Sequence, residues 1–259
     1  MKVVILAGGM GTRISEESQL KPKPMVEIGE SPILWHIMKY YSYYGYNDFI
    51  ICCGYKGFMI KEYFANYYMH SSDITFDFSQ QNNMIIHNNV AEPWKVTLVD
   101  TGLNTQTGAR IKKVQKYIGN ESFMLTYGDG LSDVPLNELV NIHKKHGKVL
   151  TMTAIQPGGR FGVLSFGEDD YTIDKFTEKA REDGGWINGG FMVAEPELFD
   201  YLEYRDDLVF EQVTMHKLAS SGQLDAYKHF GFWQCMDTMR DRVMLEHLWA
   251  SNKAPWKLW

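Results

Sequence analysis

The sequence predicts an α/β fold in which a doubly wound mixed sheet is joined to a smaller lobe. Short apolar runs that suit buried strands alternate along the chain with segments whose apolar residues recur at helical spacing. The first of these runs, Val3–Leu6, is branched and continuous, as in a parallel strand covered on both faces. A glycine-rich turn follows it directly, at the end of the strand where such sheets bind ligands.

The first lobe is predicted to comprise residues 1–156. Ser31 suits the cap of a helix with Pro32 in its first turn, and Gly45 suits the end of that helix. Further strands are predicted at 48–53, 95–99, 123–127 and 150–155, and further helices at 58–68, 108–117 and 136–146. The segment 79–92 is rich in Gln and Asn and is expected to be a surface excursion or a hairpin.

The second lobe, residues 157–259, is predicted to contain shorter strands. We expect them at 161–166, 172–177 and 190–194, with helices at 210–221 and 238–251. The two lobes are expected to form one integrated domain, since a chain of 259 residues with 44% hydrophobic composition can bury a full core.

Composition and charge limit the classes of partner. The 26 basic and 32 acidic side chains give a formal charge of −6, which argues against a nucleic-acid partner held by bulk electrostatics. The three cysteines, two of them adjacent, give no disulfide framework. We find neither a signal peptide nor the run of about twenty apolar residues that a membrane span requires. We therefore expect a cytoplasmic protein that has no contact with a membrane.

The glycine-rich turn has the composition of a phosphate-binding loop. Its glycines, which leave backbone N–H groups free to approach an anion, are Gly8, Gly9 and Gly11. Thr12 and Arg13 add a hydroxyl and a guanidinium. The spacing fits neither a P-loop nor a dinucleotide fingerprint, since Ile14 stands where the fingerprint needs glycine or alanine. The glycines could serve only to turn the chain, but Arg13 and the nearby Lys23 favour phosphate binding.

Two aspartates are candidate metal ligands. Asp129 lies between two glycines after the apolar run Phe123–Leu125, and Asp237 begins a predicted helix. An Asp-Gly turn and a helix cap are the ordinary explanations for aspartates in these positions. A magnesium ion, however, prefers one or two carboxylates together with substrate phosphates and water. The residues alone leave both explanations open.

Several blocks, in order along the chain, resemble the sugar-phosphate nucleotidyltransferases, also called nucleotide-sugar pyrophosphorylases. The blocks are Leu6–Arg13, Lys21–Gly29, Pro32–Met38, Phe49–Gly57, Glu92–Trp94, Val99–Gly102, Thr126–Gly130, Gly185–Phe191 and Gly231–Thr238. The likeness extends over nearly the whole chain and is strongest to the cytidylyl branch. It implies a Rossmann-like sheet of the nucleotide-diphospho-sugar transferase type. The first lobe would bind the nucleotide, and the second, with its C-terminal helix and tail, the sugar phosphate.

The resemblance also implies roles for individual residues. The nucleotide would be bound by Leu6, Ala7, Gly8, Gly9, Met10, Gly11, Thr12, Arg13, Lys23, Thr105, Arg110 and Gly128. The sugar phosphate would be bound by Tyr127, Glu178, Lys179, Asn188 and Gly189. Asp129 and Asp237 would hold Mg²⁺, and Arg13, Lys23 and Lys179 would be catalytic. The loop 100–110 is dense in hydroxyl and amide side chains that suit contact with a pyrimidine, but no single residue there identifies the base.

The assignment of Glu178 and Lys179 to the sugar phosphate has an alternative explanation. Outside the resemblance, a pair such as Glu178 and Lys179 is usually a solvated surface pair. Ala180 also stands where the family often has proline, which leaves this loop less rigid.

The activity that the resemblance implies is magnesium-dependent transfer of a cytidylyl group from CTP to α-D-glucose 1-phosphate, giving CDP-glucose and pyrophosphate. The sugar phosphate is already ionised at neutral pH, so it attacks the α-phosphorus in line without a general base. In the family, CDP-glucose is the precursor of dideoxy sugars in bacterial surface polysaccharide such as lipopolysaccharide O-antigen. The alternatives are UTP or dTTP as the donor, and a non-catalytic paralogue that binds a nucleotide sugar.

Aromatic residues indicate self-association. Tyrosines cluster between residues 40 and 46, and Trp249, Trp256 and Trp259 lie near the C-terminus. Such residues suit a core, a subunit interface, or a tail docked on its own domain or on a neighbouring subunit. We therefore expect a homo-oligomer.

Overall fold

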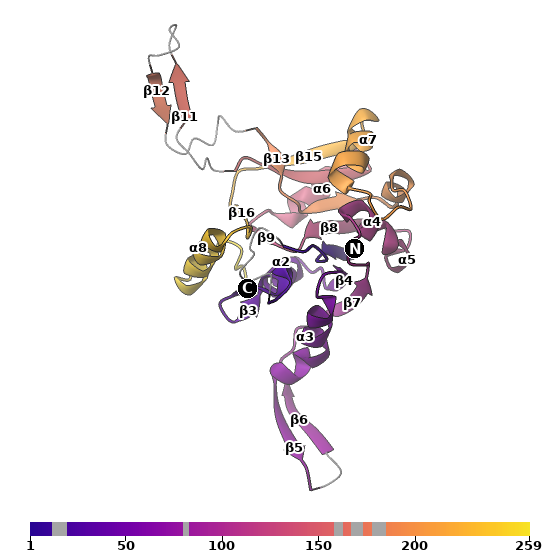
Figure 1. Cartoon of the computed structure of the whole chain (residues 1–259), viewed down its shortest axis with the longest axis vertical. Helices are drawn as coiled ribbons and strands as arrows, with labels where there is room; N and C mark the ends of the chain where they lie inside the picture. Colours follow the sequence, from indigo (N-terminus) through magenta and orange to yellow (C-terminus); the bar gives the residue numbers. More distant parts are fainter. Residues whose placement is uncertain (12–19, 80–82, 158–162, 167–172, 178–184) are drawn as a thin grey trace.

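The computed structural model describes residues 1–11, 20–79, 83–157, 163–166, 173–177 and 185–259, and at 163–166 and 173–177 it describes the backbone. The chain forms an α/β body from which two β-hairpins extend toward opposite ends of the longest axis (Figure 1). Among the helices in these ranges, none has both the length and the apolar character that crossing a bilayer demands.

A mixed sheet forms the centre of the body, and the described residues contribute eight strands to it. The strand order is β13-β10-β14-β8-β1-β4-β7, and β15 also pairs with β10. The neighbours β8, β1, β4 and β7 are parallel, whereas β14 runs antiparallel to both β8 and β10. The strands are β1 (Val3–Leu6), β4 (Asp48–Cys53), β7 (Lys95–Asp100), β8 (Phe123–Tyr127), β10 (Leu150–Ile155), β13 (Ile187–Asn188), β14 (Met192–Ala194) and β15 (Leu224–His229). This mixed sheet confirms the predicted fold class.

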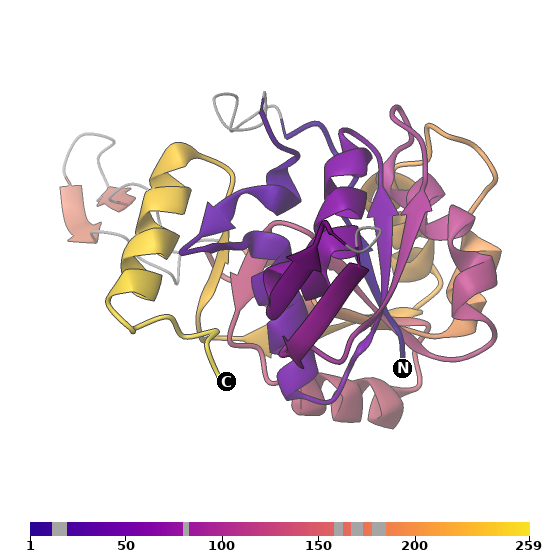
Figure 2. The ribbon, with the colours of Figure 1, turned by 90° about the horizontal axis from the view of Figure 1, so that it is seen from below.

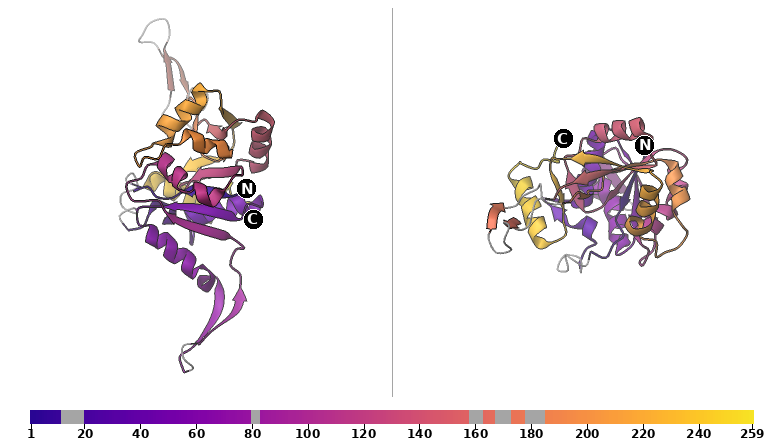
Figure 3. Two further views of the ribbon diagram at one scale, coloured as in Figure 1. Left: turned by 90° about the vertical axis from the view of Figure 1, so that its right-hand side faces the viewer. Right: turned by 90° about the horizontal axis from the view of Figure 1, so that it is seen from above.

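Both faces of the sheet are buried, as the continuous apolar runs predict. Along β1, Val3 and Ile5 belong to one core cluster and Val4 to the other, and Ile51 and Ile50 of β4 divide in the same way. Helices lie on both faces of the sheet (Figures 2 and 3). The first cluster includes residues of α2 (Ile33–Tyr43), α3 (Gly57–His70) and α6 (Leu136–His146), and the second includes residues of α4 (Thr107–Lys113), α5 (Gln115–Ile118) and α7 (Met215–Ser220). The sheet is therefore doubly wound.

The expectation that Ser31 caps the first long helix is wrong. Ser31 and Pro32 form β3 (Ser31–Pro32), which pairs with β2 (Glu27–Ile28) across a tight turn at Gly29. Gly29 has a φ of 62°, a left-handed conformation that favours glycine. Helix α2 begins only after Pro32 and has no side-chain cap. Pairing within this small hairpin therefore outweighs the local capping preference of serine.

Two predicted helices are interrupted. The 108–117 helix divides at Val114 into α4 and α5, and the 210–221 helix begins as a π-helical turn, η4 (Phe210–Thr214), before α7. Apolar spacing over so few residues does not distinguish a π turn from an α turn. The remaining short elements are η2 (Lys23–Met25), β9 (Gly130–Ser132), η3 (Pro196–Tyr201) and β16 (Trp233–Cys235).

The two hairpins that extend from the body are formed by β5 (Ser72–Asp77) with β6 (Asn83–Asn89) and by β11 (Val163–Phe166) with β12 (Ile173–Thr177). The excursion expected at 79–92 therefore belongs to the first hairpin, which begins at residue 72. The strands of the second hairpin lie within the two predicted strand ranges.

The C-terminal tail is docked on the body of its own chain, around His36. It follows α8 (Met239–Ala250) and buries Trp256 completely. Trp256 Nε1 donates to His36 Nδ1 (3.4 Å), and His36 Nε2 donates to the carbonyl of Ile28 (2.8 Å). Burial lowers the pKa of His36 to about 4, so this ring is neutral at pH 7. The C-terminal tryptophans therefore contribute to the core of the subunit itself.

The parallel strands bring their carboxyl ends to one edge of the sheet. In register, Leu6 of β1 lies beside Cys52 of β4 and Tyr127 of β8, and Cys53 lies beside Asp100 of β7. The loops that leave this edge include the glycine-rich turn, the 101–106 loop and the turn that holds Asp129. These loops carry most of the predicted site residues.

Candidate active site

A cavity of about 500 Å³ lies at this edge of the sheet. The glycine-rich turn, η2, the start of α4 and the turn after β8 contribute to its wall. The predicted residues in the wall are Leu6, Ala7, Gly8, Gly9, Gly11, Lys23, Thr105, Arg110, Tyr127, Gly128, Asp129 and Asp237. The structure thus brings most of the predicted nucleotide and metal residues together in one place.

The other predicted residues divide into two groups. Met10 is 45% exposed, and neither it nor Asn188 nor Gly189 is part of the cavity wall. Asn188 contacts the wall through a hydrogen bond to the hydroxyl of Tyr127 (2.9 Å). The other predicted residues, which are outside the ranges that the structure describes, are Thr12, Arg13, Glu178 and Lys179.

Arg110 holds the glycine-rich turn from inside the protein. Its guanidinium donates to the carbonyls of Gly8 (3.0 Å) and Gly102 (2.8 Å) and to Thr101 Oγ1 (2.6 Å). A β-carbon at Gly8 would collide with the guanidinium, so this close approach needs glycine. Burial lowers the pKa of Arg110 from its ordinary value, although that value is high enough for the side chain to stay charged. Because these acceptors are uncharged, the guanidinium contributes positive potential to the cavity.

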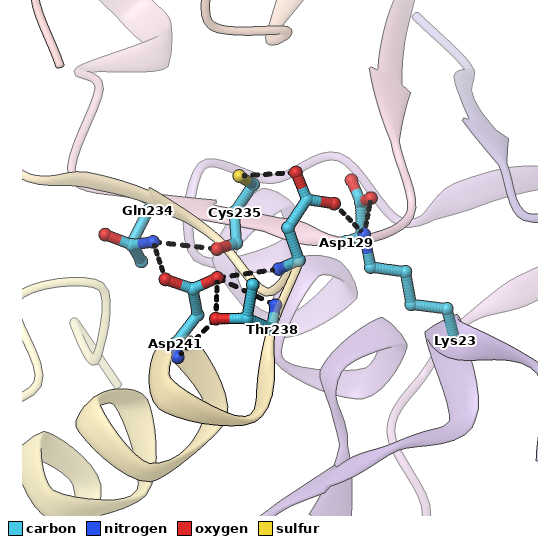
Figure 4. A network of polar contacts seen from close by, with 7 residues as sticks. Lys23, Asp129, Gln234, Cys235, Thr238 and Asp241 are labelled. Atoms are coloured by element: carbon cyan, nitrogen blue, oxygen red, sulfur yellow. Dashed lines mark hydrogen bonds and ion pairs between the residues drawn. The ribbon is translucent and has the colours of Figure 1, made fainter. Parts of the chain in front are cut away.

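Lys23 joins the two predicted metal ligands. Its Nζ lies 2.6 Å from Asp129 Oδ2 and 2.5 Å from Asp237 Oδ1 (Figure 4). The lysine is presented by η2, between Pro22 and Pro24, and its side chain is 11% exposed. Burial by itself would lower the pKa of Lys23, but the charges of the two aspartates and their hydrogen bonds outweigh it and raise the pKa. Lys23 is therefore charged in the wall of the cavity.

The structure tests the helix-cap explanation of Asp237. The cap of α8 is Thr238, whose Oγ1 accepts from the N–H of Asp241 (3.2 Å), and Asp241 Oδ2 accepts from the N–H of Thr238 (2.8 Å) (Figure 4). The carboxylate of Asp237 takes no part in this capping box and contacts Lys23 and the thiol of Cys235 (3.5 Å). The helix-cap explanation of Asp237 is therefore wrong.

The donor set of this centre suits a hard divalent cation. Asp129 and Asp237 each direct one carboxylate oxygen to the same ammonium group, so the two carboxylates lie close enough together to share one cation. Within the described ranges, no group of three or more His, Cys, Asp and Glu side chains forms a complete protein cage for a metal. Two carboxylates beside a cavity fit the preference of Mg²⁺ for few protein ligands together with phosphate oxygens and water.

Gly128 sets the position of Asp129. Its N–H donates to the carbonyl of Leu6 (3.0 Å), and a β-carbon there would lie 2.9 Å from that oxygen and 3.2 Å from Pro24 Cγ. Gly130 follows Asp129, and a β-carbon at this position would meet no atom within 4 Å. The two flanking glycines therefore differ sharply in the space around them.

Gly128→Ala is expected to lower the free energy of unfolding by about 1–3 kcal/mol, because the added methyl group overpacks the turn after β8. Gly130→Ala is the matched control and is expected to unfold like the wild-type protein. Thermal or denaturant unfolding of the two variants checks this expectation. Equal stability of both would contradict the close approach of Gly128 to β1.

Gln106 and Thr107, for which no role was predicted, line the cavity beside Thr105. Their signal was present, since both belong to the loop of hydroxyl and amide side chains at 100–110. Glu211, also not predicted, accepts hydrogen bonds from Thr107 Oγ1 (2.7 Å) and from the hydroxyl of Tyr127 (2.6 Å). A glutamate within a predicted helix gives no comparable signal.

Comparison with known proteins is informative over the full length of the chain. The nucleotidyl transferase family model matches residues 2–239. The chain is 54% identical over 260 residues to a glucose-1-phosphate cytidylyltransferase of Salmonella typhimurium, and the alignment covers 100% of both proteins. It is 43% identical over 259 residues to a probable glucose-1-phosphate cytidylyltransferase of Bacillus subtilis, again with 100% of both covered.

A solved structure gives an independent view of the fold. The crystal structure of a UDP-glucose pyrophosphorylase complexed with UDP-glucose matches with a TM-score of 0.69 at 18% sequence identity, covering 97% of this chain and 98% of that one. This likeness confirms the predicted nucleotide-diphospho-sugar transferase type of fold.

Proposed function

Because this chain belongs to the nucleotidyl transferase family, we propose that it transfers the cytidylyl group of CTP to α-D-glucose 1-phosphate and releases pyrophosphate. The observation that carries the proposal is the convergence of Lys23, Asp129 and Asp237 in a cavity that the glycine-rich turn also lines. The relatives that match over their full length support CTP and glucose 1-phosphate as the substrates.

The reaction joins two polyanions. A phosphate oxygen of glucose 1-phosphate attacks the α-phosphorus of CTP, the bond from that phosphorus to the oxygen bridging to the β-phosphate breaks, and pyrophosphate leaves. The attacking oxygen is already ionised at neutral pH, so no side chain has to remove a proton. The work of the protein is to orient the two substrates and to neutralise their charge.

The cationic side chains have separate roles in the proposal. Lys23 neutralises the α-phosphate, a role that its position in the cavity wall supports. Arg13 binds the β- and γ-phosphates, and Lys179 binds the sugar phosphate. The roles of Arg13 and Lys179 rest on the family resemblance, because both residues lie outside the described ranges.

Asp129 and Asp237 are the proposed ligands of Mg²⁺, which the convergence of their carboxylates supports. When bound, the ion supplies positive charge that offsets the phosphate charge of the two substrates. Gly128 and the capping box of α8 hold the two aspartates in place without using their carboxylates.

The two lobes divide the binding of the substrates. The nucleotide side, within residues 1–156, contains the glycine-rich turn, Thr105 and Arg110. The sugar side includes Asn188 and Gly189 of the 157–259 lobe, and Tyr127 lies between the two sides. CDP-glucose made here would supply dideoxy-sugar synthesis for surface polysaccharide, as the resemblance implies.

Pyrophosphate release with glucose 1-phosphate and each nucleoside triphosphate in turn tests the proposal. We expect CTP to give the highest kcat/KM. A preference for UTP or dTTP would contradict CTP as the donor, but the enzyme would still be a nucleotidyltransferase. No release with any donor would favour the non-catalytic paralogue.

We also propose a homo-oligomer, which the apolar face of the β5–β6 hairpin supports. Phe76 lies opposite Met84 and Ile74 opposite Ile86, and Phe76 and Phe78 are 53% and 79% exposed. The hairpin extends well away from the body (Figure 1), and an isolated two-stranded hairpin is only marginally stable in water.

Light scattering at micromolar concentration is expected to give a mass above the 29.9 kDa of one chain. Replacing Phe76 and Phe78 with serine is expected to shift the mass toward the monomer. A monomeric wild-type protein would contradict the proposal.

The proposed location is the cytoplasm, and three free thiols support it. Cys52 and Cys53 are buried and Cys235 is partly buried, with no disulfide among them. Free cysteines of this kind are typical of a reducing compartment.

A further inference from the structure

Glu211 connects the two sides of the cavity from behind its wall. One carboxylate oxygen accepts from the hydroxyl of Tyr127 (2.6 Å), and the other accepts from Thr107 Oγ1 (2.7 Å). Thr107 lines the cavity at the start of α4, and Tyr127 lines it at the end of β8. Glu211 itself is not part of the cavity wall. These two hydrogen bonds of its side chain are both with residues of that wall.

On the nucleotide side, Thr107 is bound to the segment that carries Glu211 by more than one contact. The N–H of Phe210 donates to Thr107 Oγ1 (2.9 Å), so this hydroxyl accepts from one residue and donates to the next. Beside it, the N–H of Gly108 donates to the carbonyl of Leu208 (2.9 Å). The first turn of α4 is thus fixed to the chain just before α7.

On the sugar side, the chain of hydrogen bonds continues through Tyr127. Its hydroxyl accepts from Asn188 Nδ2 (2.9 Å), and Asn188 Oδ1 accepts from the N–H of Gly190 (2.9 Å). The same hydroxyl thus donates to Glu211 and accepts from Asn188. The amide orientation of Asn188 therefore depends on Tyr127, and the position of Tyr127 depends on Glu211.

The local backbone at Glu211 is unusual. Glu211 lies in the π-helical turn η4, next to Phe210, which is completely buried. Single π turns are rare and often occur at functional sites, because the wider turn changes the direction of the side chains it carries. Here the turn directs one carboxylate to two hydroxyl groups on different elements.

We propose that Glu211 is a positioning residue that sets the sugar side of the cavity relative to the nucleotide side, through Tyr127 and Thr107. This inference rests on the proposed function, since its effect is the alignment of the two substrates. A displacement of about 1 Å between reacting groups can cost about 10²-fold in rate. The expected consequence of losing Glu211 is therefore a lower kcat, with smaller changes in the KM of either substrate.

The test compares kcat per mole of folded enzyme in four proteins. Glu211→Ala is expected to lose about 10- to 100-fold in kcat, and Glu211→Gln, which keeps one acceptor, is expected to recover part of the loss. Gln212→Ala, an exposed neighbour on the same π turn, is the matched control and is expected to behave like the wild type. CTP and glucose 1-phosphate are varied separately, so that changes in kcat and in each KM are resolved.

A double-mutant cycle separates positioning from simple loss of stability. If Glu211 acts through Tyr127, Glu211→Ala combined with Tyr127→Phe loses less than the product of the two single losses. Multiplicative losses would overturn the proposal, and so would a Glu211→Ala variant that is less stable but has the kcat of Gln212→Ala. No turnover by the wild type and by Gln212→Ala would instead contradict the proposed function, and with it this role of Glu211.

Discussion

Alanine at Asp129 or at Asp237 is expected to reduce CDP-glucose formation by about 10²–10³-fold or more, while the protein stays folded. The rate falls because each substitution removes one of the two carboxylates that converge at the cavity wall. The fold survives because Lys23 keeps its ion pair with the other aspartate, so no buried charge loses all of its partners. Steady-state turnover and thermal unfolding measure the two effects separately.

Asp48→Asn provides the control for these variants. Asp48 forms an ion pair with Lys95 (2.9 Å) at the start of β4, the opposite end of the sheet from the cavity. We expect the same turnover as in the wild type. Turnover that is also unchanged in Asp129→Ala or Asp237→Ala would show that the altered carboxylate is not needed for the reaction.

Lys23→Met is expected to reduce both turnover and stability. Loss of one charge-neutralising group at developing phosphate charge costs about 10²–10³-fold in kcat. Asp129 and Asp237 would then face each other without a cation, at 30% and 20% side-chain exposure. The cost in unfolding free energy should lie between about 1 kcal/mol, as for exposed pairs, and about 3–5 kcal/mol, as for buried ones.

Lys21→Met is the matched control for Lys23→Met. Lys21 lies two residues earlier and pairs with Glu27 (2.6 Å), and it is not part of the cavity wall. It is expected to retain turnover and to lose at most about 1 kcal/mol of stability. Equal turnover in the two variants would refute the role of Lys23.

Much of the fold could be predicted because burial leaves a local signal. The strand at 48–53, the strand at 123–127 and the helix at 136–146 have the predicted bounds, since each is a continuous apolar run or a clear helical stripe. The errors occur where contacts distant in sequence outweigh local preference. Ser31 pairs with Ile28 across a turn, and Phe210 enters a π turn fixed to Thr107.

In the site, too, some residues could be predicted from local sequence and others depend on contacts distant in sequence. The carboxyl ends of parallel strands lie at the same edge of a sheet. The glycine-rich turn and Asp129 could therefore be expected at one edge. The residues around Asp237 are compatible both with a helix cap and with a metal ligand. Only the structure shows that Thr238, and not Asp237, caps α8. Glu211 was not predictable, because its significance comes only from meeting Tyr127 and Thr107 in space.

Mass spectrometry can follow product formation from CTP and glucose 1-phosphate with and without Mg²⁺, and so test whether Lys23, Asp129 and Asp237 form the site of this reaction. The site predicts CDP-glucose and pyrophosphate in equal amounts when Mg²⁺ is present, loss of both with a chelator, and recovery when the ion is restored. A wild-type protein that binds both substrates and forms no CDP-glucose under these conditions would contradict the assignment of Lys23, Asp129 and Asp237 to this reaction.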